Sequence, residues 1–140
     1  MDRQSDAAVD GNTVYIQNSD TSNLYAYDTE SEAWSQLPDC VTKNCPIAII
    51  NGWLTTLGGC SHYGNSNELF SLTGKDSGKS SAWMKKFPPM PTKRSLMATL
   101  TTGATLIVTG GLGVNGVLST VEVMNTETFQ WSTAADLPQP

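Results

Sequence analysis

The stretch that decides the fold is residues 105–131, TLIVTGGLGVNGVLSTVEVMNTETFQW. It holds two short runs rich in apolar and β-branched residues, at 105–109 and 121–125, separated by a glycine-rich loop. Alternation with a period of two is typical of β-strands, and clustered glycines favour turns. The stretch therefore predicts strands joined by tight turns, without a helix.

The same order of features occurs three times along the chain, and each occurrence ends in a tryptophan. Trp34 and Trp83 are 49 residues apart, and Trp83 and Trp131 are 48 apart. A near-constant period in this range indicates repeated units, each too small to bury its own apolar face alone. The sequence therefore predicts three stacked units, with the tryptophans packing between adjacent sheets.

Turn residues place the strands of each unit. Asp-Gly and Asn-Gly favour hairpin turns because they tolerate positive φ. The first turns are Asp10-Gly11-Asn12, Asn51-Gly52 and Thr102-Gly103. The strands expected after them are residues 13–16, 53–57 and 105–109, and the next strands are residues 24–28, 69–73 and 121–125.

Glycine pairs and prolines limit these strands. The second strands of units two and three end in Gly58-Gly59 and Gly110-Gly111, where glycine permits a bend in crowded backbone, while unit one has Gln17-Asn18. A hydrophobic residue and a proline follow each tryptophan, and proline ends a strand because it lacks a backbone donor. Residues 73–80 predict a longer outer hairpin in unit two.

These features resemble the kelch repeat. The closest resemblance runs from Pro91-Thr92-Lys93-Arg94-Ser95 through Gly110-Gly111 and residues 121–125 to Trp131. It implies an all-β fold in which each repeat is a β-propeller blade of four antiparallel strands. We expect blades at residues 1–39, 40–91 and 92–140, together forming a half-propeller. The sequence departs from the family at Gln17, and at Leu72 and Met124, where tyrosine is usual.

Three blades do not close a ring. Propellers typically close with roughly four to eight blades, and an arc of three exposes apolar faces on its first and last blades. Two explanations are open: the chain is half of a longer propeller, or two copies form a six-bladed ring about a two-fold axis. We expect a homodimer in which blade one of each copy contacts blade three of the other.

Composition argues against several functions. The net charge of −5 and pI near 4.6 do not favour nucleic acid or anionic membranes, since both attract basic surfaces. No apolar run approaches about 20 residues, the length of a membrane span, and the N-terminus lacks the apolar core of a signal peptide. Three cysteines and no Asn-x-Ser/Thr acceptor fit a reducing compartment. We therefore expect a cytoplasmic protein.

Cations recur in the segments before the blades. Arg3, Lys43 and Lys93 lie 8 to 10 residues before the glycine of the first turn. In an up-and-down blade these segments share a face with the loop between the second and third strands, where kelch domains commonly bind ligands. Cations there favour a carboxylate or phosphate in a peptide. The expected partner-binding residues are Arg3, Lys43, Asn44, His62, Tyr63, Asn65, Lys93, Arg94, Ser95 and Asn115, of which Arg94 and Ser95 match family positions that grip acidic peptides.

Other chemistries have weaker support. Cys40, Cys45, Cys60 and His62 share one rim and permit a zinc site, but their spacing departs from the tight Cys-x-x-Cys knuckle, so we expect free thiols, no metal and no cofactor. Residues 111–116, GLGVNG, match the dinucleotide fingerprint by letter, yet a strand follows in place of the required helix. No Gly-x-Ser-x-Gly elbow accompanies the single histidine.

The sequence therefore predicts a non-enzymatic protein-interaction module that self-assembles into a closed propeller and binds a peptide or protein on its loop face. The binding role comes from the resemblance, because a fold alone does not establish a function. The alternative is a purely structural, self-assembling propeller fragment with no separate ligand.

Overall fold

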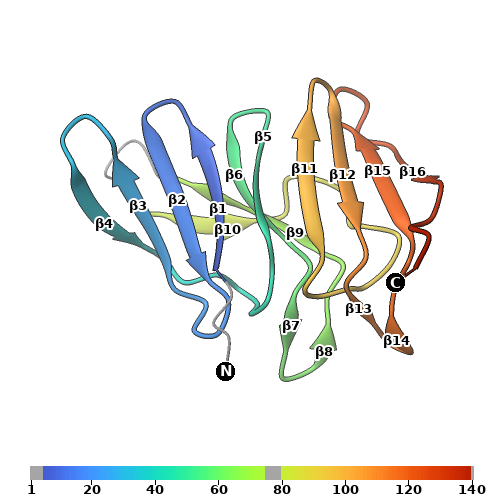
Figure 1. Cartoon of the computed structure of the whole chain (residues 1–140). Coiled ribbons are helices and arrows are strands. Elements are labelled where there is room, and N and C mark those ends of the chain that lie inside the picture. Colours follow the sequence, from blue (N-terminus) through green and yellow to red (C-terminus); the bar gives the residue numbers. More distant parts are fainter. Residues whose placement is uncertain (1–4, 75–79, 140) are drawn as a thin grey trace.

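The computed structural model describes residues 5–74 and 80–139, which form three four-stranded antiparallel sheets, blades 1 to 3, arranged side by side in an arc (Figure 1). Blade 1 comprises β1 (Ser5–Asp10), β2 (Thr13–Asn18), β3 (Leu24–Asp28) and β4 (Ala33–Leu37). Blade 2 comprises β5 (Ile47–Ile50), β6 (Trp53–Leu57), β9 (Leu69–Thr73) and β10 (Ala82–Met84). Blade 3 comprises β11 (Ala98–Thr102), β12 (Thr105–Thr109), β15 (Val121–Asn125) and β16 (Trp131–Ala134).

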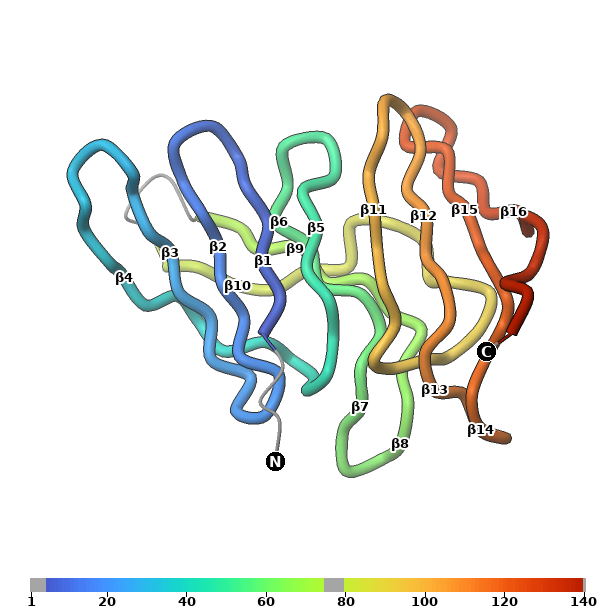
Figure 2. The backbone as a smooth tube through the Cα atoms, in the orientation of Figure 1, coloured from blue at the N-terminus to red at the C-terminus, as the bar shows by residue number. Residues whose placement is uncertain are grey.

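Each sheet follows the order of the chain from one edge to the other. The first strands β1, β5 and β11 lie next to one another, and the tryptophan-bearing fourth strands form the opposite edges (Figure 2). This meander needs only short connections, because consecutive antiparallel strands pair directly.

The predicted all-β fold class is confirmed. The expected strands coincide with β3, β6, β9, β12 and β15, while β2 continues two residues beyond the expected end, to Asn18. In the part of the chain that the structure describes, no helix is long and apolar enough to cross a bilayer. The longer outer hairpin expected at residues 73–80 falls mainly on residues 75–79, outside the described residues.

Two additional hairpins extend from the ends of blades 2 and 3. They are β7 (Cys60–Ser61) with β8 (Gly64–Asn65), and β13 (Leu112–Gly113) with β14 (Gly116–Val117). Each hairpin also pairs with the segment before its own blade, through single bridges between Lys43 and Cys60 and between Ser95 and Leu112. The glycine-rich segment expected to be a loop is therefore partly ordered as a two-stranded ribbon.

Apolar side chains fill the seams between blades. The seam between blades 1 and 2 contains Tyr15, Leu24, Ala26, Ile47, Leu54 and Leu72. The seam between blades 2 and 3 contains Ile50, Leu57, Leu69, Leu106, Val108 and Met124. Because side chains alternate along a strand, one face of blade 2 packs on blade 1 and its other face packs on blade 3.

The tryptophans of blades 2 and 3 make the same contact across these seams. The indole N–H of Trp83 donates to the carbonyl of Asp39 at 2.8 Å, and that of Trp131 donates to the carbonyl of Pro88 at 3.1 Å. In both cases the acceptor lies five residues after the tryptophan of the preceding blade. Trp34 has no preceding blade within this chain, and its side chain is 60% exposed.

Glycine is required where blade 2 meets the segment before blade 3. Gly58 has a φ of +57°, and a Cβ there would lie 2.4 Å from the carbonyl oxygen of Arg94. The amide of Gly59 donates to that same oxygen at 2.9 Å. Adjacent blades approach so closely here that backbone contacts backbone, which excludes any side chain.

The strand register corrects the position assigned to the missing glycine pair of blade 1. The amides of Gly58 and Gly110 each donate to the chain just before the third strand, and in blade 1 this bond is made by Asn18, to the carbonyl of Asn23 at 2.9 Å. Asn18-Ser19 therefore occupies the place assigned to Gln17-Asn18. Gln17 belongs to β2, where it pairs with Leu24, and its buried side chain bonds to the Asn18 carbonyl and the Ser19 hydroxyl.

The close approach at Gly58 predicts unequal effects of alanine at two glycines with nearly equal φ, Gly58 at +57° and Gly11 at +58°. An alanine Cβ at Gly11 would meet nothing within 4 Å, so Gly11→Ala should lower the free energy of unfolding only by the cost of a left-handed backbone, about 1–2 kcal/mol. Gly58→Ala adds a clash with the Arg94 carbonyl, and we expect it to lower the free energy of unfolding by roughly a further 1–3 kcal/mol. Urea unfolding monitored by tryptophan fluorescence measures both, and equal losses would contradict the assigned contact.

Candidate partner-binding face

One end of the arc gathers the segments that sequence analysis associates with binding. We define the loop face as the segments before β5 and β11, the β2–β3 loop, and the hairpins β7–β8 and β13–β14. These elements all lie at the lower edge of the molecule in Figure 1. The turns between the first and second strands of each blade lie at the opposite edge.

A hollow of about 430 Å³ opens on the loop face beside hairpin β7–β8. It is lined by Ser22, Val41, Lys43, Cys60, Ser61 and His62. Lys43 supplies a positive charge, while the serines and His62 supply hydrogen-bonding groups. Val41 is 49% exposed and adds an apolar wall. This combination suits a side chain that carries an anionic group next to an apolar one.

The hairpin tips are exposed and partly apolar. Tyr63 at the turn of β7–β8 is 95% exposed and Val114 at the turn of β13–β14 is 83% exposed. The two hairpins are tied together, because the side-chain amide of Asn65 donates to the carbonyl of Leu112 at 3.1 Å. The bond joins the base of one hairpin to the base of the other, and Asn115 also lies at the β13–β14 turn.

Most of the expected binding residues lie at the surface. Lys43, Lys93, His62, Tyr63 and Asn115 are exposed, and Asn65 is partly exposed. Asn44 is half-buried, and its backbone holds the three blades together. Its amide donates to the Ser19 carbonyl at 3.2 Å, and its carbonyl accepts from the Leu96 amide at 3.0 Å. Arg3 lies outside the described residues.

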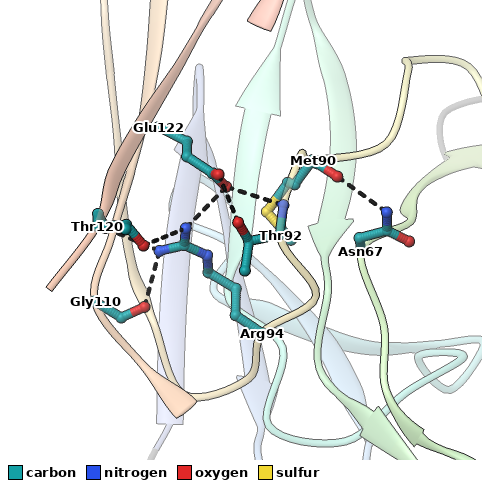
Figure 3. A network of polar contacts seen from close by, with 7 residues as sticks. All are labelled: Asn67, Met90, Thr92, Arg94, Gly110, Thr120 and Glu122. Carbon is teal, nitrogen blue, oxygen red and sulfur yellow. Dashed lines mark hydrogen bonds and ion pairs between the residues drawn. The ribbon is translucent and has the colours of Figure 1, made fainter. Parts of the chain in front are cut away.

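Arg94 and Ser95 are not on the surface, which corrects the expectation that they contact a partner. Arg94 is fully buried, and its guanidinium pairs with Glu122 at 2.8 Å. It also donates to the carbonyls of Gly110 and Thr120, at 2.9 and 3.0 Å (Figure 3). Ser95 is buried while its backbone pairs with Leu112. These residues hold the end of blade 3 together and are unavailable for binding.

Glu122 explains why Arg94 turns inward. It lies between Val121 and Val123 on β15, on the face of the strand that packs against blade 2, so its charge is buried unless a cation reaches it. Thr92 completes its surroundings by donating its hydroxyl at 2.7 Å (Figure 3). An acidic residue in an otherwise apolar strand is the sequence signal that could have assigned Arg94 to this role.

The cysteines do not converge on a metal site. In the ranges 5–74 and 80–139, no three His, Cys, Asp or Glu side chains form a group that could hold a metal ion. Cys40 and Cys45 are buried free thiols, and the interaction with Cys45, together with burial, raises the pKa of the Cys40 thiol above its ordinary range. Cys60 instead accepts a weak bond from the side-chain amide of Asn44 at 3.4 Å, and His62 lies in the exposed hairpin.

Some residues of the loop face were not anticipated. Val41 and Ser61 line the hollow beside Lys43, yet neither carries a distinctive pattern in the sequence. They lie together because the Lys43–Cys60 bridge draws the segment before β5 against hairpin β7–β8. Only the unexpected pairing of this hairpin reveals their proximity.

Comparison with known proteins supports the reading of the blades. Residues 93–138 match the family model described as the kelch motif. The third blade is therefore similar to the kelch motif. The chain is also 28% identical over 135 residues to Kelch-like protein terF of Aspergillus terreus, an alignment that covers 92% of this chain. These matches confirm the predicted resemblance to the kelch-repeat family.

The relative is much longer than this chain. The chain spans 29% of the length of terF. The similarity of blade 3 to the kelch motif supports a role in protein interaction.

Loss of the buried cation predicts a strong effect on stability. Arg94→Met leaves Glu122 buried without its ion pair, and we expect the free energy of unfolding to fall by about 3–5 kcal/mol. Replacing both groups, as Arg94→Met with Glu122→Gln, removes the unpaired charge and should restore part of that loss. Urea unfolding of the two variants measures the difference, and a double variant less stable than Arg94→Met would contradict the pairing.

Proposed function

We propose that this chain is a non-enzymatic protein-interaction module that binds an acidic peptide segment on the loop face. The observation that carries the proposal is the hollow in which Lys43 lies beside Ser61, His62 and the exposed Val41. A peptide carboxylate or phosphate would meet the Lys43 ammonium, and an adjacent apolar side chain would contact Val41. Tyr63 at the neighbouring hairpin tip offers further apolar contact area.

Lys93 supports the same partner chemistry. It is exposed in the segment before β11, next in sequence to the buried Arg94. Arg94 is buried in an ion pair with Glu122. Among the expected binding residues that the structure describes, the exposed cations are therefore Lys43 and Lys93. Their charges stand out on a chain whose net charge is −5.

We further propose that two copies complete one propeller. Each copy contributes three blades, and six is the one multiple of three between the roughly four and eight blades with which propellers close. The three free thiols fit the reducing conditions of the cytoplasm.

A structural fragment without a separate ligand is the second candidate. Exposed apolar side chains on the outer faces of blades 1 and 3 favour it, since they give the chain a reason to assemble whether or not the loop face binds a partner. Binding measurements on the loop face distinguish the two.

Removing one exposed cation from the loop face should weaken peptide binding. Against an array of acidic and phosphorylated peptides, we expect Lys43→Gln and Lys93→Gln each to lower affinity roughly three- to tenfold, because each loses one charge-assisted contact. Lys86→Gln is the matched control: it changes the charge equally, but Lys86 lies over the Trp53 ring at 4.2 Å, away from the loop face. If Lys43→Gln and Lys93→Gln both left the peptide-binding profile unchanged, the structural fragment without a separate ligand would be favoured.

The proposed ring predicts a particle of twice the mass of one chain, which is 15.0 kDa. Light scattering coupled to size exclusion at micromolar concentration should report this dimer. A monomer throughout the accessible concentration range would contradict ring completion, but it would leave the loop-face proposal to the peptide array.

A further inference from the structure

The outer faces of blades 1 and 3 have the same pattern as the faces already packed inside the molecule. Strand register makes Val9, Val14, Tyr27 and Trp34 of blade 1 equivalent to Ile49, Leu54, Leu72 and Trp83, which pack toward blade 1 in the existing seam. It makes Ile107, Val121 and Val123 of blade 3 equivalent to Tyr15, Leu24 and Ala26, which pack toward blade 2. The outer face of blade 1 thus has the pattern of one side of a seam, and the outer face of blade 3 has the pattern of the other side. Among the residues that the structure describes, neither outer face packs on another blade of this chain.

These outer faces are uncharged and carry exposed apolar side chains. Val9 is 63% exposed and Leu100 60% exposed, and each lies on the outer face of its sheet. By register, the strand positions on the outer face of blade 1 include no charged residue, and the same holds for blade 3. Packing one face on the other would therefore bury no unpaired charge.

The tryptophan contact fixes how these faces would meet. Trp83 and Trp131 each donate to a carbonyl five residues after the preceding tryptophan, at Asp39 and Pro88. The residue five positions after Trp131 is Asp136. Asp136 also matches Asp39 in its surroundings. The next residue, Leu137, donates its amide to Ser119 at 2.8 Å, just as Cys40 donates to Ser22.

We infer that Trp34 of one copy docks on blade 3 of a second copy and donates its indole N–H to the carbonyl of Asp136 there. Val9, Val14 and Tyr27 of the first copy then pack against Leu100, Ile107 and Val123 of the second. The seam occurs twice about the two-fold axis. This inference rests on the proposed ring and adds the register in which the copies meet.

Trp34 offers a direct test, because it is 60% exposed in the single chain, where its ring contacts Tyr27 of the same blade. Buried tryptophans often dominate interface energies, so Trp34→Ala, which removes the side chain from both seams of the dimer, should weaken dimerisation roughly 100-fold to 1,000-fold in sedimentation equilibrium. Trp34→Phe keeps most of the apolar contact and should weaken dimerisation only about 25-fold, because the dimer loses one hydrogen bond, worth about fivefold, at each of its two seams. Tyr63→Ala, at an even more exposed aromatic on the loop face, should leave the dimer unchanged.

Photo-crosslinking locates the contact. p-Benzoylphenylalanine at position 34, in a mixture of ¹⁴N- and ¹⁵N-labelled chains, should give a mixed-isotope product joined at residues 135–137 of the other copy, identified by peptide mass spectrometry. A dimer whose crosslinks lie elsewhere would overturn the register while the proposed ring stands. A chain that stays monomeric would overturn both, leaving the outer faces to further blades of a longer polypeptide.

Discussion

The structure depends on close backbone contact at the point where the end of one blade meets the segment leading into the next. Gly59 donates to the Arg94 carbonyl, and Gly58 leaves that carbonyl the room a Cβ would take. Asn44 makes the corresponding links on both sides, to Ser19 and to Leu96. Apolar seams supply area, but these short contacts set how far one blade is displaced from the next.

Much of the fold follows from local sequence. Strand alternation and the Asp-Gly and Asn-Gly turns placed β3, β6, β9, β12 and β15 because each depends on neighbouring residues only. The β7–β8 and β13–β14 hairpins were missed, since strands of two residues are too short for a period to show. The end of β2 was misplaced because Gln17 reads as polar, yet it is buried and satisfied by its own neighbours.

The candidate site was harder to predict for a related reason. Sequence position brought Lys43, Lys93 and Arg94 to one end of the blades, but it could not say which side chains face outward. That outcome depends on Glu122, 28 residues after Arg94 along the chain, whose buried carboxylate draws the guanidinium inward. Of these two neighbouring cations, Arg94 therefore stabilises the fold, while Lys93 remains exposed to solvent.

The tryptophan contact also gives the array a direction. Blade 1 carries the tryptophan donor Trp34, and blade 3 ends in the carbonyl of Asp136, so the contact proposed between copies would be head to tail. Head-to-tail joining makes either a closed ring or an open filament, and the choice depends on whether the rotation between successive blades returns to its start. In the proposed assembly, the angle set at Gly58 and Gly59 would therefore decide between a closed ring and an open filament.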